Sequence, residues 1–280
     1  MAVSVMQERA TITRDAIVQS IVASLCPLNY VQAFWEGGSV AFKRADRWSD
    51  LDLYALVDES KVPNTFRVIE RSLRTLSPIS QTYVVEGGYE GVSQKFYRLR
   101  DADEFAVIDL GILTPKSPEK FLTPEIHGTN VFYFNKRGAA KATPLDKASF
   151  TRRRCKRLRM LNLRFAMFNN YVIKEIERGH SLEALEDYRV ITLGILVEAL
   201  RIRFGPLHFD FRMHYVDREL PAGALKRLQR LSYVRDVKDL EKKYREATDW
   251  CSETLDLAAR MRRKEGMMQN VTPNTLIKRR

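Results

Sequence analysis

The sequence predicts an α+β protein in which a mixed sheet with helices against it is followed by a C-terminal helical bundle. Short β-type runs alternate with helical patterns in the first half of the 280-residue chain, whereas the second half has helical patterns only. The formal net charge is +12, yet residues 1–140 hold 16 Lys+Arg against 17 Asp+Glu, so the second half carries the whole basic excess. Hydrophobic residues at 45% exclude a disordered or fibrous chain.

The first half contains two helical patterns and five strand patterns. A helix is expected over residues 12–26, where apolar positions recur at helical spacing and Thr13 is the predicted N-cap. A second helix is expected over residues 62–76. The expected strands, rich in β-branched and aromatic residues, cover residues 30–35, 51–57, 80–86, 93–99 and 105–113. These elements form a predicted first domain, residues 1–140.

The second half is predicted to be helical throughout. One long helix is expected over residues 146–178 and is ended by Gly179. The further helices are expected over residues 181–204, 221–231 and 234–263. The helical domain is therefore placed at residues 141–265, and residues 266–280, which show no periodicity, are expected to be a loose tail.

The composition indicates a cytoplasmic protein. No stretch approaches the roughly 18 uninterrupted apolar residues of a membrane span, and residues 1–15 lack an apolar signal-type core. The cysteines are odd in number and widely separated, which predicts reduced thiols with packing roles; they are Cys26, Cys155 and Cys251. The histidines lack metal-ligand spacing and are expected at the surface or in packing; they are His127, His180, His208 and His214.

Two carboxylates at the start of the second strand predict a metal site. Asp50 and Asp52 stand at positions i and i+2, so both side chains project from the same face of the strand. Like charges this close repel each other unless a cation lies between them. Oxygen ligands of this kind suit Mg²⁺, which is usually held by one or two protein carboxylates together with substrate phosphates.

Two further features accompany this acidic pair. Gly37, Gly38 and Ser39 follow the first strand, where glycines let backbone N–H groups approach an anion and a serine hydroxyl can bond a phosphate oxygen. A third acid, Asp109, lies inside an otherwise apolar strand, where an unpaired charge is costly. A Gly-Gly-Ser turn or a paired aspartate alone is more often an ordinary turn or a solvated pair.

Together, with ten residues between Ser39 and Asp50, these features resemble the nucleotidyltransferase superfamily of the DNA polymerase beta type. That family's motif is an apolar residue, Gly-Gly or Gly-Ser, a spacer of similar length, Asp-apolar-Asp-apolar, and a third carboxylate on a later strand. The resemblance covers about residues 12–115. The helical half looks like the companion domain of stand-alone bacterial and archaeal members, which include aminoglycoside nucleotidyltransferases. One departure is the segment Phe42-Lys43-Arg44, where members often carry a small or basic pair.

The resemblance implies a transferase that moves a nucleoside monophosphate, expected to be AMP from ATP, to a hydroxyl of a small molecule or protein with release of pyrophosphate. It implies catalytic and Mg²⁺-binding roles for Asp50, Asp52 and Asp109. It further implies nucleotide binding by Gly38, Ser39, Lys43 and Arg44. The base that accepts the hydroxyl proton stays open, because Asp109, Glu86 and Glu90 are all candidates.

Two other classes of protein remain open from the sequence. The basic second half suggests a nucleic-acid-binding protein or an RNA-directed transferase, although no RNA-reading or DNA-reading motif is present. Residues 147–164 hold eight basic side chains and no acid; most are expected to be solvated, and one or two to bind phosphate. The third class is a partner-binding module with a vestigial nucleotide site, which would have lost a carboxylate, and all three are present. The sequence holds no motif that identifies the molecule that accepts the nucleotide.

Overall fold

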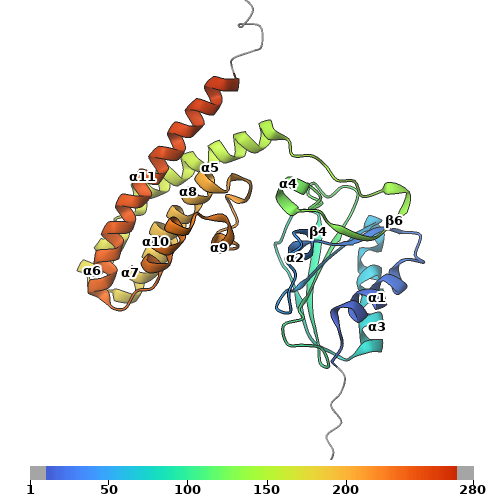
Figure 1. Cartoon of the computed structure of the whole chain (residues 1–280). Coiled ribbons are helices and arrows are strands. Elements are labelled where there is room, and N and C mark those ends of the chain that lie inside the picture. The colour runs from blue at the N-terminus through green and yellow to red at the C-terminus, as the bar shows by residue number, and fades with distance from the viewer. Residues whose placement is uncertain (1–10, 270–280) are drawn as a thin grey trace, which may run out of the picture. The chain divides into compact units, whose positions relative to one another are not determined.

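A computed structural model describes the backbone of residues 11–269 and the side chains of residues 11–260. The chain divides into two compact units, one ending at Leu145 and the other beginning at Asp146. The first unit, the sheet unit, is a six-stranded mixed sheet with helices, and the second, the helical unit, is built from helices (Figure 1). The predicted α+β class is therefore confirmed. Across the described backbone, the helices lack an apolar run long enough to cross a lipid bilayer.

The sheet contains the five predicted strands and one more. The strands are β1 Val31–Glu36, β2 Leu51–Val57, β3 Ile79–Val84, β4 Val92–Leu99, β5 Ile108–Leu113 and β6 Val131–Asn135. Their order is β3-β4-β5-β2-β1-β6, and β2 pairs with β5 in parallel while the other neighbours are antiparallel. Sequence analysis missed β6, a five-residue edge strand that pairs only with β1 in the sheet.

The helices of the sheet unit form around their apolar faces. They are α1 Arg14–Leu25, α2 Gly38–Ala41, α3 Val62–Leu76 and α4 Pro124–His127. The hydroxyl of Thr13 accepts the amide N–H of Ala16, as expected of an N-cap. Helices α1 and α3 pack together against one face of the sheet, where Ile21, Ile69 and Leu53 belong to one buried cluster. Apolar burial on this face holds the central strands in place.

The helical unit corrects three sequence predictions, two of which concern its first two helices and its last helix. Its helices are α5 Lys147–Phe168, α6 Tyr171–Glu177, α7 Ser181–Asp187, α8 Gly194–Phe204, α9 Val216–Glu219, α10 Ala222–Ser232 and α11 Val237–Gln269. The single helix predicted over residues 146–178 is thus two helices. They separate at Asn169, whose side chain is turned inward to bond Tyr244 and Thr248 at 3.2 and 3.0 Å. The predicted tail is also too long, because α11 continues through Gln269; residues 270–280 lie outside the described range.

The helix predicted over residues 181–204 is interrupted by a π-helical turn, Tyr188–Leu193, between α7 and α8. The hydroxyl of Tyr188 donates to the carbonyl of Leu231 at 3.0 Å, which anchors the turn to α10. Among the cysteines, Cys251 is buried and Cys155 is half-buried, but Cys26 is exposed at the end of α1. The expectation that all three pack inside is therefore wrong for Cys26.

Candidate active site

Asp50, Asp52 and Asp109 come together at the central parallel strand pair of the sheet unit. Asp52 on β2 and Asp109 on β5 are direct register partners, and Asp50 immediately precedes β2. The residues that flank Asp52 along the strand, Leu51 and Leu53, point into the core under α1 and α3. Because side chains alternate along a strand, the aspartates occupy the opposite face of the sheet. Two strand segments separated by more than 50 residues thus supply one acidic cluster.

The electrostatics of this cluster oppose simultaneous ionisation of its members. Burial raises the pKa of Asp52 to about 7, and the negative charges of Asp109 and Asp50 add to the effect. Burial also raises the pKa of Asp109, although a hydrogen bond from Gln94 Nε2 to Asp109 Oδ1 at 2.6 Å acts in the opposite direction. The pKa of Asp50 is raised by burial and is lowered in part by Arg14. A cation placed among the three carboxylates would remove this repulsion.

Arg14 binds the backbone that leads into β2 and the carboxylate of Glu36. Its Nη1 donates to the backbone carbonyls of Ser49 and Asp50, the latter at 2.9 Å, and its Nη2 donates to Glu36 Oε1 at 2.9 Å. Glu36 is 5% exposed, and its second oxygen accepts the hydroxyl of Tyr133. This network neutralises a buried acid at the end of β1 and fixes the chain that carries Asp50.

We expect Arg14→Met to destabilise the protein by about 2–3 kcal/mol, because it leaves the carboxylate of Glu36 buried without its cation. Adding Glu36→Gln to Arg14→Met should recover part of the loss, since the uncompensated charge is then removed. Chemical denaturation of the two variants and the wild type measures both effects. Equal stability of the single and double variants would contradict the assigned role of this ion pair.

The Gly-Gly-Ser turn lies directly against Asp52. The amide of Gly37 donates to the carbonyl of Asp52 at 2.9 Å. Gly38 has φ +53°, and a Cβ at this position would stand 1.7 Å from Asp52 Oδ2. The hydroxyl of Ser39 is buried and has no hydrogen-bond partner in the described part of the chain. Glycine is required here both by backbone conformation and by the space that Asp52 occupies, and the unsatisfied hydroxyl leaves one polar group available for a ligand.

The other predicted nucleotide-binding residues, Lys43 and Arg44, occupy the exposed turn that follows α2. The amide of Arg44 donates to the carbonyl of Ser39 at 2.8 Å, and its guanidinium lies 5.2 Å from the ring of Phe42. No contact described for either side chain joins it to the aspartates. Glu86 and Glu90, the alternative bases, are exposed in the connection between β3 and β4.

Sequence analysis missed three residues that contact or influence the cluster, namely Arg14, Glu36 and Gln94. Arg14 stands more than 20 residues before the Gly-Gly-Ser turn in the sequence, and only the packing of α1 against the sheet brings it to Asp50. Glu36 adjoins Gly37, and an acid at the end of an apolar strand was a readable signal for it. Gln94 faces Asp109 from the neighbouring strand, which follows from strand order and register rather than from any local pattern.

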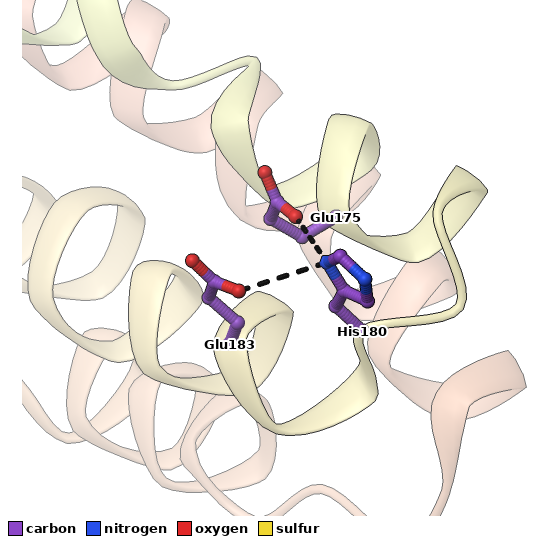
Figure 2. A group of neighbouring side chains, drawn as sticks. All are labelled: Glu175, His180 and Glu183. Atoms are coloured by element: carbon purple, nitrogen blue, oxygen red, sulfur yellow. Dashed lines mark hydrogen bonds and ion pairs between the residues drawn. The ribbon is translucent and has the colours of Figure 1, made fainter.

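A second group of titratable side chains lies in the helical unit, around His180 (Figure 2). His180 Nδ1 is 2.9 Å from Glu175 Oε2 and 3.7 Å from Glu183 Oε2. Glu175 is 3% exposed, and it also pairs with Lys174 and Arg178 at 3.2 and 3.0 Å. The cluster already contains cations that balance Glu175, and it joins the end of α6 to the start of α7. We therefore interpret it as a structural ion-pair network.

The chain was compared with known families, curated proteins and solved structures. No protein-family model matches the chain, and no curated protein matches it. Among solved structures, an aminoglycoside 6-adenyltransferase from Bacillus subtilis is 12% identical, with 88% of this chain and 92% of that chain covered and a TM-score of 0.31. At that TM-score and identity the likeness supports no inference about activity.

Proposed function

We propose that the chain is a Mg²⁺-dependent nucleotidyltransferase that moves a nucleoside monophosphate, AMP in the first instance, from a nucleoside triphosphate to a hydroxyl group. The observation that carries the proposal is the pairing of Asp52 with Asp109 across β2 and β5, beside Asp50 and against the Gly38 turn. The register of β2 and β5 brings together Asp52 and Asp109, which the sequence motif also singles out, and Asp50 immediately precedes β2.

The residues at this place suit Mg²⁺ and a phosphate. Mg²⁺ prefers carboxylate oxygens and keeps places for water and substrate phosphate, and three clustered aspartates supply the oxygens. Burial raises the pKa of all three carboxyl groups, and repulsion from neighbouring carboxylates adds to the raised pKa of Asp52 and Asp109; a divalent cation would offset this repulsion. The buried hydroxyl of Ser39 lacks a partner among the described residues, and the missing Cβ of Gly38 leaves room for the carboxylate of Asp52 against the turn.

The proposed chemistry is displacement at the α-phosphorus. The acceptor oxygen forms a bond to that phosphorus, the bond to the bridging oxygen breaks, and pyrophosphate leaves. Mg²⁺, when bound, would supply charge neutralisation for the entering and leaving oxygens. Asp50 and Asp52 would hold the metal, and Asp109 would act next to the attacking oxygen.

Two of the chain's own groups orient this reaction. Gln94 holds Oδ1 of Asp109, so Oδ2 is the oxygen available to bind metal or to accept the hydroxyl proton. Ser39 would donate its unpaired hydroxyl to a phosphate oxygen of the nucleotide. Glu86 and Glu90 remain alternative acceptors of the hydroxyl proton. The proposed roles of the three aspartates do not depend on either of them.

The test is incubation of the full chain with Mg²⁺ and ATP carrying label on the α-phosphate or on the γ-phosphate. The acceptors offered are the protein itself, a small-molecule extract, a panel of aminoglycosides and total RNA. We expect α-label on one acceptor, γ-label only in pyrophosphate, and neither without Mg²⁺. Transfer of the γ-phosphate would contradict the proposal, as would binding of RNA with no transfer in any mixture.

A further inference from the structure

A cavity of about 400 Å³ lies within the helical unit, among residues that the proposed function does not use. This volume is typical of pockets that bind small molecules. Its walls come from α5, the π-helical turn, α8 and the connection between α8 and α9. The charged side chains that line it are Arg157, Arg164, Arg189, Glu198 and Arg212. We call this cavity the arginine pocket, because four of its five charged groups are guanidiniums.

The charges of the arginine pocket do not balance. Arg157 and Glu198 neutralise each other through a bidentate pair, with Nε to Oε2 at 2.6 Å and Nη2 to Oε1 at 2.5 Å. Over residues 11–260, no acidic side chain pairs with Arg164, Arg189 or Arg212. Three positive charges therefore line one cavity without a counterion from the described part of the protein.

The helical walls carry three of the lining arginines. Arg157 and Arg164 are seven residues apart on α5, so they lie on the same helix face, and α5 packs against α8 (Figure 1). Arg189 belongs to the π-helical turn, which Tyr188 anchors from beneath. Insertions of this kind in helices are rare and occur frequently at functional sites, because the extra residue redirects the side chains around it.

The fourth wall, which carries Arg212, is held by a buried arginine outside the pocket. Arg201 is 0% exposed, and it donates to the carbonyl of His214 at 2.6 Å and to Glu219 Oε2 at 2.8 Å. Arg212 itself has φ +52°, a backbone conformation that is uncommon for residues other than glycine. The connection is thus tied to α8 and α9 in a conformation that brings Arg212 and Met213 to the cavity.

We propose that the arginine pocket binds the phosphoryl groups of a small molecule. A phosphate monoester carries a charge of about −1.5 to −2 at neutral pH, and a diphosphate carries more, whereas one carboxylate would leave two of the three arginines unpaired. A planar guanidinium can donate two parallel hydrogen bonds to the oxygens of one phosphate group. A cluster of arginines around one cavity therefore suits a phosphoryl ligand. Val190, Ile195 and Met213 provide apolar wall for an uncharged part of the ligand.

This proposal does not depend on the nucleotidyltransferase function, since every lining residue belongs to the helical unit. It also selects among the basic residues of α5. Arg157 and Arg164 line the pocket, whereas Arg152 and Arg159 on the same helix are exposed and do not line it. The latter two supply a matched control that removes the same charge from the same helical unit.

The experiment is calorimetric titration of inorganic pyrophosphate into the full chain without Mg²⁺, at low and at moderate salt. We expect Arg164→Gln/Arg212→Gln to weaken binding at least about tenfold, because each substitution removes a charge-assisted contact. Arg152→Gln/Arg159→Gln should stay within about twofold of wild type. Circular dichroism checks that both double variants retain the wild-type helix content.

Titration of ATP and of inorganic triphosphate into wild type, again without Mg²⁺, identifies the source of the phosphoryl groups: tighter binding of ATP indicates a nucleotide, and equal affinities indicate another phosphorylated molecule. The proposal is overturned if pyrophosphate does not bind wild type. It is also overturned if the two arginine variants lose affinity equally, because the effect is then general charge.

Discussion

Asp52→Asn is expected to eliminate nucleotidyl transfer and, without Mg²⁺, to raise the melting temperature of the protein. Transfer should fall by more than about 100-fold, because a direct metal ligand matters more than the groups that orient it. Stability should rise because burial holds the pKa of the Asp52 carboxyl at about 7 in the folded protein, well above its ordinary value of 3.8. A buried acid that lowers stability is typical of a functional site, where the charge of the residue is needed for activity.

The pH dependence of this gain follows from the raised pKa. An acid whose pKa is higher in the folded state contributes stability below its unfolded pKa, and it loses that contribution as pH rises through the folded pKa. The advantage of Asp52→Asn over wild type should therefore be small near pH 4, grow between about pH 4 and 7, and level off above that. The shift corresponds to an upper bound of about 4 kcal/mol.

Thermal melts across this pH range, with and without Mg²⁺, measure both sides of the prediction. The control is Asp249→Asn, an exposed aspartate of α11, which should change neither transfer nor melting temperature. Mg²⁺ should stabilise wild type and leave Asp52→Asn unaffected, because binding to the folded state raises stability by mass action. Equal stabilisation of wild type and Asp52→Asn by Mg²⁺ would show that the metal binds elsewhere.

The fold was predictable where a local pattern and its packing agree. Runs of strand-forming residues located β2 and β5, and Thr13 and the apolar period located α1. The break between α5 and α6 was not readable, because it depends on bonds from Asn169 to α11, about 75 residues further along the chain. The edge strand β6 likewise depends on its pairing with β1, a tertiary contact.

The candidate site was predictable in its acids but not in its surroundings. Asp50, Asp52 and Asp109 stand out because charge inside or beside an apolar strand is unusual. Gln94 and Arg14 reach these acids only through the order of strands and the packing of α1. The basic excess of the second half was equally visible in the sequence. That four of its arginines line one cavity was not, because this depends on the π-helical turn and on the connection that carries Arg212.

The second large effect is expected for Gly38→Ala. The added Cβ would lie 1.7 Å from Oδ2, 2.4 Å from Cγ and 2.9 Å from Cβ of Asp52, so rotation of the carboxylate tip alone cannot relieve the clash. The aspartate side chain must leave its place, or the turn must move away from β2. The first movement separates Asp52 from Asp109, and the second carries Ser39 away from Asp52. In either case transfer should fall by more than about 100-fold.

Gly138→Ala is the matched control for backbone strain. Gly138 has φ +64°, close to that of Gly38, but a Cβ there meets no atom within 4 Å. Both variants incur the cost of a left-handed alanine, about 1 kcal/mol, whereas only Gly38→Ala also displaces Asp52. Denaturation curves should show the cost of a left-handed alanine in both variants and a further loss of stability from the clash in Gly38→Ala. Transfer assays should show loss of activity in Gly38→Ala alone. If Gly38→Ala retained transfer and Mg²⁺-dependent stabilisation, the position of Asp52 against this turn would not be the catalytic arrangement.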